Sequence, residues 1–251
     1  EAALAAVQKN GFALQFASPK LQADREVVLA AVSQHGAALQ HASERLRGDS
    51  EVVQAAALRK EGALRYATAK LRADRNAVIQ IVAKDPASLE FASEELRADA
   101  KVVKAAAKRK AWTAQYASPE LLASTSFMRD LVRRSGQTLR YATPELRADK
   151  ETVLAAVRSY GFALECASES LRDDEDVVLA AVASSGYALQ FASLKLRNDR
   201  KVVLEALLEC PSSFKYASKA MHQDPEAVAL YSLDPGSRDL MVELRRNPQG
   251  D

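Results

Sequence analysis

The sequence contains few of the residues that mark loops, disulfides or membrane spans. Its 251 residues include only 9 glycines and 8 prolines, which excludes a disordered or loop-rich chain. The two cysteines, Cys166 and Cys210, belong to no C-x-x-C pair. We therefore expect no disulfide framework and a reducing compartment, either the cytoplasm or an organelle matrix or stroma. No apolar run approaches the roughly 18 residues that a membrane-spanning helix needs, so no membrane insertion is expected.

Aromatic residues and excess charge are also scarce. Aromatic side chains make up 6% of the sequence and apolar residues 48%, so the core must consist mainly of Ala, Val and Leu. A core of such small side chains requires helices in close contact. Lys and Arg number 35 against 33 Asp and Glu, a net charge of +2. A dedicated nucleic-acid binder usually carries a strong basic excess on one face, so this balance argues against nucleic acid as the partner.

What the sequence does contain is a repeat with a period of 25 residues. The dipeptide Ala-Ser/Thr recurs nine times without insertion or deletion. Leu or Met follows three residues after each Ser/Thr, and Asp three residues after that, except at Ser124. Such self-similarity is the signature of a repeat architecture. The units span about 1–23, 24–48, 49–73, 74–98, 99–123, 124–148, 149–173, 174–198 and 199–223, with a partial unit to 233 and an off-pattern C-terminal cap or tail at 234–251.

Within each unit, residue types predict a first helix of about 10 or 11 residues that begins after the Asp. The Asp24 carboxylate can accept hydrogen bonds from N–H groups of the first turn, and Glu26 suits the helix dipole. Val28 and Val32 fall on one face of this helix. Glycines recur where it should end, and we expect them to adopt the left-handed conformation there. These glycines are Gly11, Gly36, Gly136, Gly161 and Gly186, and Pro86 and Pro211 occupy the same position.

The second half of each unit predicts a second, shorter helix and a capped turn. Segments such as 37–42 carry Ala, Leu and Ala at helical spacing, and Pro directly after Thr143 suits the first position of a new turn at 144–147. Because no 25-residue unit can bury its apolar face alone, we expect an all-α fold, an α-solenoid of about nine repeats. The alternation in 13–17 could instead indicate a strand of a leucine-rich-type repeat, which the poor strand propensity of Ala disfavours.

The repeated pattern is D-x-E-V-V-L-A-A-V-x-x-x-G-x-A-L-x-(F/Y)-A-S-x-x-L-R, which residues 149–172 and 174–197 follow closely. It resembles a tandem helical repeat family catalogued as domain of unknown function 4116, over about residues 1–230. The resemblance implies an array of the kind found in algae, other protists and some intracellular bacteria. It implies no activity, cofactor or catalytic residue. With the Ala- and Arg-rich composition, it suggests an algal source.

The histidines and cysteines form no pattern typical of catalysis or metal binding. His35 and His41 lie six residues apart, which does not place them on one helical face. His41 and Cys166 stand where other units have Phe or Tyr, so we expect both in or near the core, with the thiol inert. There is no phosphate-binding loop, G-x-S-x-G or H-E-x-x-H motif. We therefore predict no metal, no cofactor and no catalytic residue.

Six arginines recur one residue after the repeated Leu, and stacking should align them into a stripe, the Arg row. One hypothesis is that each pairs with a nearby Asp or with helix-end carbonyls of a neighbouring unit. The other is that the row binds anions or an acidic partner. The Arg row consists of Arg47, Arg72, Arg97, Arg147, Arg172 and Arg197.

The pattern breaks around residues 112–128. Ala114 replaces the repeated core Leu, Leu122 replaces an arginine of the row, and Trp112 is the only Trp. One interpretation is compensated packing, in which Trp112 and Phe127 refill the volume lost at Ala114. The other is an apolar patch that docks a partner. Its candidate residues are Trp112, Leu122, Phe127 and Met128.

The leading functional hypothesis is a non-catalytic protein-binding scaffold, either a free adaptor or a peripheral subunit of a large multiprotein assembly such as an algal organellar complex. The alternative is the recognition arm of a larger enzyme or effector whose catalytic domain lies outside this chain. Recognition of nucleic acid by helical repeats is a third hypothesis, which the near-neutral charge weakens. We also expect a capping helix at 238–246 and, because the first unit shows no cap, residues before Glu1.

Overall fold

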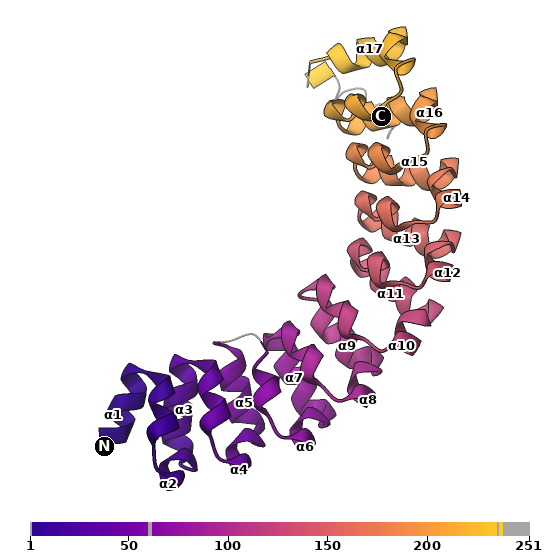
Figure 1. Ribbon diagram of the computed structural model, residues 1–251. Helices are drawn as coiled ribbons and strands as arrows, with labels where there is room; N and C mark the ends of the chain where they lie inside the picture. The colour runs from indigo at the N-terminus through magenta and orange to yellow at the C-terminus, as the bar shows by residue number, and fades with distance from the viewer. Residues whose placement is uncertain (1, 60–61, 235, 238–251) are drawn as a thin grey trace, which may run out of the picture. The chain divides into compact units, whose positions relative to one another are not determined.

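The computed structural model describes residues 2–59, 62–234 and 236–237 (Figure 1), so the capping helix expected at 238–246 lies outside the described residues. The chain divides into two compact units, unit 1 at 1–121 and unit 2 at 122–251. All regular elements of the described residues are helical, as the repeat predicted. None of these helices has both the length and the apolar character needed to cross a membrane.

A long α-helix begins each repeat and runs for eight to ten residues. In unit 1 the long helices are α1 (Ala2–Lys9), α3 (Arg25–Gln34), α5 (Ser50–Ala57), α7 (Arg75–Lys84) and α9 (Ala100–Ala107). In unit 2 they are α11 (Thr125–Arg134), α13 (Lys150–Ser159), α15 (Glu175–Ser184), α16 (Arg200–Glu209) and α17 (Pro225–Ser232).

The predicted aspartate caps are confirmed. Asp24 accepts hydrogen bonds from the N–H groups of Glu26 at 2.9 Å and Val27 at 3.2 Å, which satisfies donors that have no partner inside the helix. Ser124, which breaks the Asp series, keeps the same role and accepts from the Phe127 N–H at 3.5 Å. The chemistry of the cap therefore fixes where each long helix starts.

The second helix of each repeat is a 3-10 helix. Its hydrogen bonds join residues three apart, as between the Ala42 N–H and the Leu39 carbonyl at 3.0 Å. A rise of about 2 Å per residue lets six residues return along most of a long helix that is about 15 Å in length. These helices are η1 (Gly11–Phe16), η2 (Gly36–His41), η3 (Ala63–Tyr66), η4 (Pro86–Phe91), η5 (Ala111–Tyr116), η6 (Gly136–Tyr141), η7 (Gly161–Cys166), η8 (Gly186–Phe191) and η10 (Pro211–Tyr216).

The prediction that the repeated glycines adopt the left-handed conformation is wrong. Among the described residues only Gly62 has a positive φ. The chain leaves α3 through His35 in an extended conformation, so no left-handed residue is needed. What the glycines provide is close approach, because a Cβ on Gly136 would lie 2.2 Å from the Ala156 carbonyl oxygen of the next repeat. The corresponding distances are 2.3 Å for Gly11, 2.5 Å for Gly161 and 2.4 Å for Gly186.

A short helical turn completes each repeat, and the predicted Ser/Thr cap is confirmed at most of these turns, although Ser18 and Ser43 make no side-chain cap hydrogen bond. Thr143 accepts a hydrogen bond from the Leu146 N–H at 3.5 Å, and Pro144 takes the first helical position. The turns are α2 (Pro19–Gln22), α4 (Glu44–Arg47), α6 (Ala69–Arg72), α8 (Glu94–Arg97), α10 (Pro119–Ala123), α12 (Pro144–Arg147) and α14 (Glu169–Arg172), and in the last repeats the 3-10 turns η9 (Leu196–Asn198) and η11 (Met221–Gln223).

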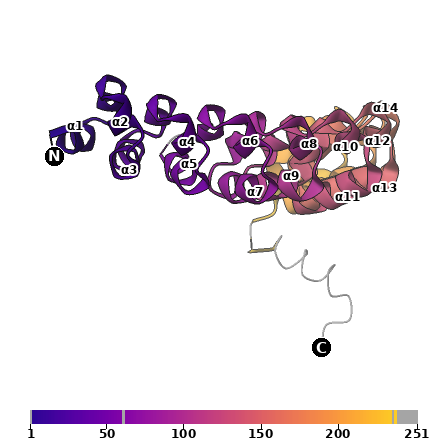
Figure 2. The same ribbon diagram turned by 90° about the horizontal axis from the view of Figure 1, so that it is seen from below.

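Consecutive repeats pack side by side within each unit. In unit 1, α3 contacts both α1 and α5, and in unit 2, α13 contacts both α11 and α15. Figure 2 shows the repeats of unit 1 following one another in a row from α1 to α9. The core between them is built from small apolar side chains, such as the fully buried Val28, Ala31 and Leu39. Small side chains let the helices approach closely, which explains a core with so few aromatic residues.

Candidate protein-binding surfaces

Ion pairs between neighbouring repeats use the capping aspartates. The Arg75 Nε lies 2.5 Å from the Asp99 Oδ2, and Lys150 Nζ lies 2.9 Å from the Asp174 Oδ2. The Arg75 guanidinium, together with N–H groups of α9, holds the pKa of Asp99 below its ordinary value. The cation in these pairs is the first residue of a long helix, a position that the sequence analysis did not single out. These pairs therefore connect repeats without involving the Arg row.

The Arg row contributes its backbone to the stack. In each case the Ser/Thr N–H of the following repeat donates to the carbonyl of the arginine. These bonds are Thr68 to Arg47 at 3.2 Å, Ser93 to Arg72, Ser118 to Arg97, Ser168 to Arg147, Ser193 to Arg172 and Ser218 to Arg197, the last five at 2.9 Å.

The side chains of the Arg row make few hydrogen bonds or ion pairs with the described residues. All six Nε atoms are buried without a hydrogen-bond acceptor among the described residues. Arg97 and Arg172 lie 3.9 and 3.8 Å from Glu94 and Glu169, but these glutamates are 91% and 95% exposed, so solvent weakens the attraction. No ion pair in the described part of the chain joins an arginine of the row to a capping aspartate. The half-buried stems therefore hold guanidinium groups whose outer ends face solvent.

The candidate patch around Trp112 is not a continuous exposed surface. Phe127 is 4% exposed and Met128 fully buried, because they take the core positions that Val27 and Val28 hold in α3. Both belong to unit 2, as does Leu122, which is half-buried. Trp112 belongs to unit 1 and is 37% exposed. Of the four residues, only Trp112 therefore presents an exposed aromatic side chain.

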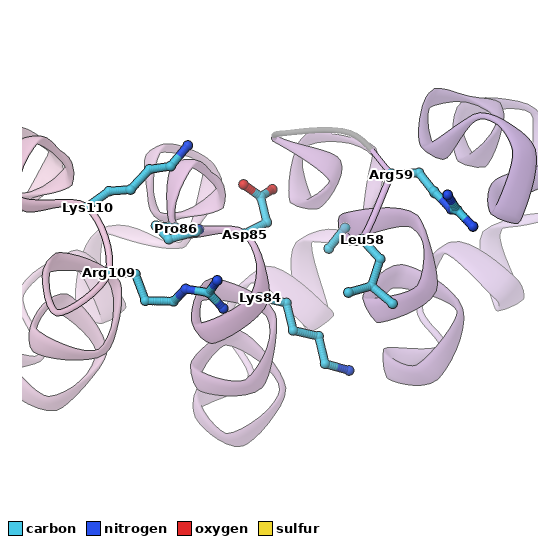
Figure 3. A pocket seen from close by; sticks show the side chains of 8 residues that line it. Leu58, Arg59, Lys84, Asp85, Pro86, Arg109 and Lys110 are labelled. Carbon is cyan, nitrogen blue, oxygen red and sulfur yellow. The ribbon is translucent and has the colours of Figure 1, made fainter.

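A pocket of about 410 Å³ opens in unit 1 where α5, α7 and α9 end. We call it the basic pocket, because four cations line it. Figure 3 shows Asp85 and Pro86 in the middle of this group, with Arg109 and Lys110 on one side and Leu58 and Arg59 on the other. The lining residues are Ala57, Leu58, Arg59, Lys84, Asp85, Pro86, Arg109 and Lys110.

Asp85 is a buried carboxylate at the centre of this pocket. It is 3% exposed, and its Oδ2 accepts hydrogen bonds from the Gly62 N–H at 2.6 Å and the Ser88 hydroxyl at 2.5 Å. Its Oδ1 is buried and has no hydrogen-bond partner in the described chain. The two bonds at Oδ2 hold the carboxylate in place, which leaves one fixed acceptor unsatisfied.

The cations of the basic pocket sit at helix C-termini, where the helix dipole favours positive charge. The Arg109 Nη1 donates to the Ala83 carbonyl at 2.7 Å, and Lys84 Nζ donates to the Gln54 Oε1 at 2.6 Å. This pocket was not predicted from the sequence, although the sequence contains a signal for it. Arg59, Lys84, Arg109 and Arg134 lie 25 residues apart, whereas Gln34, Ser159, Ser184 and Glu209 take that position in other repeats.

The described contacts of the histidines and cysteines are hydrogen bonds and packing within the fold. The His35 Nδ1 accepts a hydrogen bond from the Gly11 N–H at 3.2 Å, and His222 stacks on Phe214 with ring centroids 4.3 Å apart. Cys166 is half-buried, and burial raises the pKa of its thiol, with the nearby Glu165 charge adding to the effect. No group of three or more His, Cys, Asp or Glu side chains that could hold a metal occurs among the described residues.

The comparisons with known proteins agree with this repeat architecture. A family described as Domain of unknown function (DUF4116) matches residues 1–47, 24–72, 74–122, 125–172 and 174–222. Each match covers about two of the 25-residue repeats. No curated protein and no solved structure matches the chain. Because the matches cover most of the sequence, the chain belongs to the DUF4116 family of tandem repeats.

Proposed function

We propose that the chain is a non-catalytic α-solenoid of about nine repeats that binds one or more proteins, either as a free adaptor or as a peripheral subunit of a larger assembly. The residues that recur every 25 positions are used for stacking: the capping aspartates, the close-approach glycines and the Ser/Thr N–H groups. The Arg row recurs in six of the nine repeats, and its side chains take no part in those contacts. A second role, outside the stack, accounts for them.

The observation that carries this proposal is the set of guanidinium groups in the Arg row. A buried Nε and a half-buried stem restrict each side chain before any partner arrives, which lowers the entropy lost on binding. The two outer nitrogens then offer a fork that matches a carboxylate. Neighbouring helices are typically about 8–10 Å apart, so within each unit the row presents such forks at a regular interval. Acidic side chains of a folded or extended protein fit this spacing, and the near-neutral net charge disfavours a nucleic acid.

Affinity capture from a nuclease-treated native extract tests the proposal, with the chain as bait and bound proteins quantified by mass spectrometry. The variant Arg147→Gln/Arg172→Gln removes two forks of unit 2. The matched control Arg133→Gln/Arg158→Gln removes two exposed cations from the ends of long helices in the same unit. We expect a stoichiometric partner on the wild type and the control, with recovery reduced about tenfold or more on the variant.

A second variant, Arg147→Lys/Arg172→Lys, keeps the charge and loses the planar fork. We expect intermediate recovery of the same protein, because a point charge recognises a carboxylate less specifically than the fork does. Equal recovery of the partner on the wild type and the glutamine variant would show that the Arg row is not part of the binding surface. A partner that is captured from an untreated extract but lost after nuclease treatment would contradict the proposal as a whole.

A further inference from the structure

The basic pocket combines three kinds of group that a single bound molecule could contact: an unsatisfied acceptor, apolar side chains and cations. The first is the buried acceptor on Asp85. A buried carboxylate oxygen without a donor is unfavourable, and the residues that the structure describes supply none. An occupant that brings an N–H or O–H group to Oδ1 would remove this deficit. Because Oδ2 is fixed by the Gly62 N–H and Ser88 hydroxyl, the position of the acceptor is set in advance.

The second kind of group is apolar. Leu58 is 66% exposed at the rim of the pocket, and Ala57 and Pro86 also line it. Pro86 takes the position of the close-approach glycines, where a Cβ in other repeats would lie within 2.5 Å of a carbonyl oxygen of the next helix. A proline cannot make that approach, which is consistent with an open space between repeats at this point. A small aliphatic side chain of a partner would find apolar contacts here.

The third kind of group is cationic. Arg59 is exposed, and its side chain has no hydrogen-bond or ion-pair partner among the described residues. Lys84 and Arg109 each donate one side-chain hydrogen bond to a neighbouring oxygen and have further N–H donors. Lys110 lies on the opposite side of Asp85 from Arg59, as Figure 3 shows. Acidic side chains of an occupant can therefore meet cations on either side of Asp85, while the backbone between them reaches the buried acceptor.

We propose that the basic pocket binds a short acidic and apolar peptide segment of a partner protein. Acidic side chains of the segment lie at Arg59 on one side of Asp85 and at Arg109 on the other, with Lys84 between them. An aliphatic side chain lies on Leu58, and a backbone N–H donates to the Asp85 Oδ1. A DNA backbone offers only acceptor oxygens, which a buried carboxylate repels, so the lining of the pocket favours a peptide. This inference rests on the protein-binding role proposed above and names the chemistry of one contact.

Fluorescence anisotropy with the purified chain and a short fluorescein-labelled peptide of Glu, Leu and Ser tests this inference. Two matched peptides replace either every Glu by Gln or every Leu by Ser, and both should bind at least about fivefold more weakly. The variant Arg59→Glu/Lys84→Glu should weaken binding of the first peptide about tenfold or more. The control Lys20→Glu/Lys70→Glu makes the same charge change at exposed positions on α2 and α6 and should leave binding within about twofold.

The affinity of the Asp85→Asn variant for the acidic peptide distinguishes the proposal from simple charge attraction. The substitution removes a negative charge from a basic site, so attraction alone predicts tighter binding of an acidic peptide. The proposal predicts weaker binding, by about threefold to tenfold. The reason is that the amide can still accept from Gly62 while its nitrogen replaces the free acceptor by a donor. If this variant does not fold, Leu58→Ser provides the second test, with a similar loss expected for the Leu-containing peptide only.

Three outcomes would overturn the inference. One is tighter binding by a folded Asp85→Asn variant. Another is equal weakening by the pocket and control reversals. The last is displacement of the peptide by a single-stranded oligonucleotide at lower concentration than by unlabelled peptide. The peptide assay uses no native partner, so peptide binding without capture of a protein would contradict the proposed function alone, and capture without peptide binding would contradict this inference alone.

Discussion

Gly136→Ala should destabilise the chain although alanine is normally the better helix residue. The substitution adds one methyl group at the start of η6, where that carbon would lie 2.2 Å from the Ala156 carbonyl oxygen and 2.8 Å from the Tyr160 Cβ. The carbonyl belongs to the backbone of α13 and cannot rotate away. The two repeats must therefore separate locally, which disturbs the packing of α11 against α13.

The expected cost is the difference between two effects. Forcing an extra carbon into a well-packed contact typically costs about 1–3 kcal/mol. Replacing glycine where φ is not positive returns about 0.4–1 kcal/mol, because the unfolded chain loses freedom. The contact is shorter than any normal van der Waals separation, so the steric effect dominates. We expect Gly136→Ala to lower the free energy of unfolding by about 1–3 kcal/mol.

Gly48→Ala is the matched control, because the same substitution there meets no backbone atom closer than 3.5 Å. Other repeats already carry Ala at this position, as at Ala73, Ala98 and Ala148. We expect it to be neutral or to stabilise by up to about 1 kcal/mol. Urea unfolding followed by circular dichroism measures both, with the midpoints compared at equal slope. If Gly136→Ala is as stable as Gly48→Ala, close approach is not the reason for the repeated glycine.

Three further predictions concern the cap, the ion pair and the core. Asp24→Ala should cost about 0.5–2 kcal/mol in urea unfolding, and Asp24→Ser should restore most of it, because Ser124 caps α11 in the native chain. Arg75→Ala should raise the pKa of Asp99, measured by carbon NMR titration. Since the folded pKa of Asp99 is depressed, its stabilisation is present above the unfolded value of about 3.9 and is lost as pH falls through the folded value, so the variant should lose less stability in acid. An unchanged Asp99 titration would contradict the pairing. Leu164→Ala, at a fully buried site, should cost about 2–5 kcal/mol, and a cost below about 1 kcal/mol would place it outside the core.

Sequence reasoning predicted the elements whose cause is local. Asp24 caps its helix and Thr143 caps a turn because a side-chain oxygen lies within reach of N–H groups two or three residues on, and that reach depends only on nearby residues. The role of Gly136 could not be predicted in this way. Its cause is the Ala156 carbonyl of another repeat, which becomes visible only when the repeats are placed side by side.

The candidate surfaces likewise include features that the sequence reveals and features that depend on contacts between repeats. Phe127 and Met128 could have been assigned to the core, because they align with Val27 and Val28 of the buried helix face. The alignment of Arg59 with Lys84 was likewise present in the sequence. The unsatisfied oxygen of Asp85 was not, because it depends on which of two oxygens Gly62 and Ser88 reach from their own positions in the fold.

Hydrogen–deuterium exchange on the chain, free and with its captured partner protein bound, tests the central claim most directly. If side chains outside the stack recognise a protein, amide exchange should slow in α12 and α14, which carry Arg147 and Arg172, or at the ends of α5, α7 and α9 around the basic pocket. The buried long helices should exchange as before. Unchanged exchange at both surfaces in a stable complex, or the failure of any protein to form such a complex, would contradict the account.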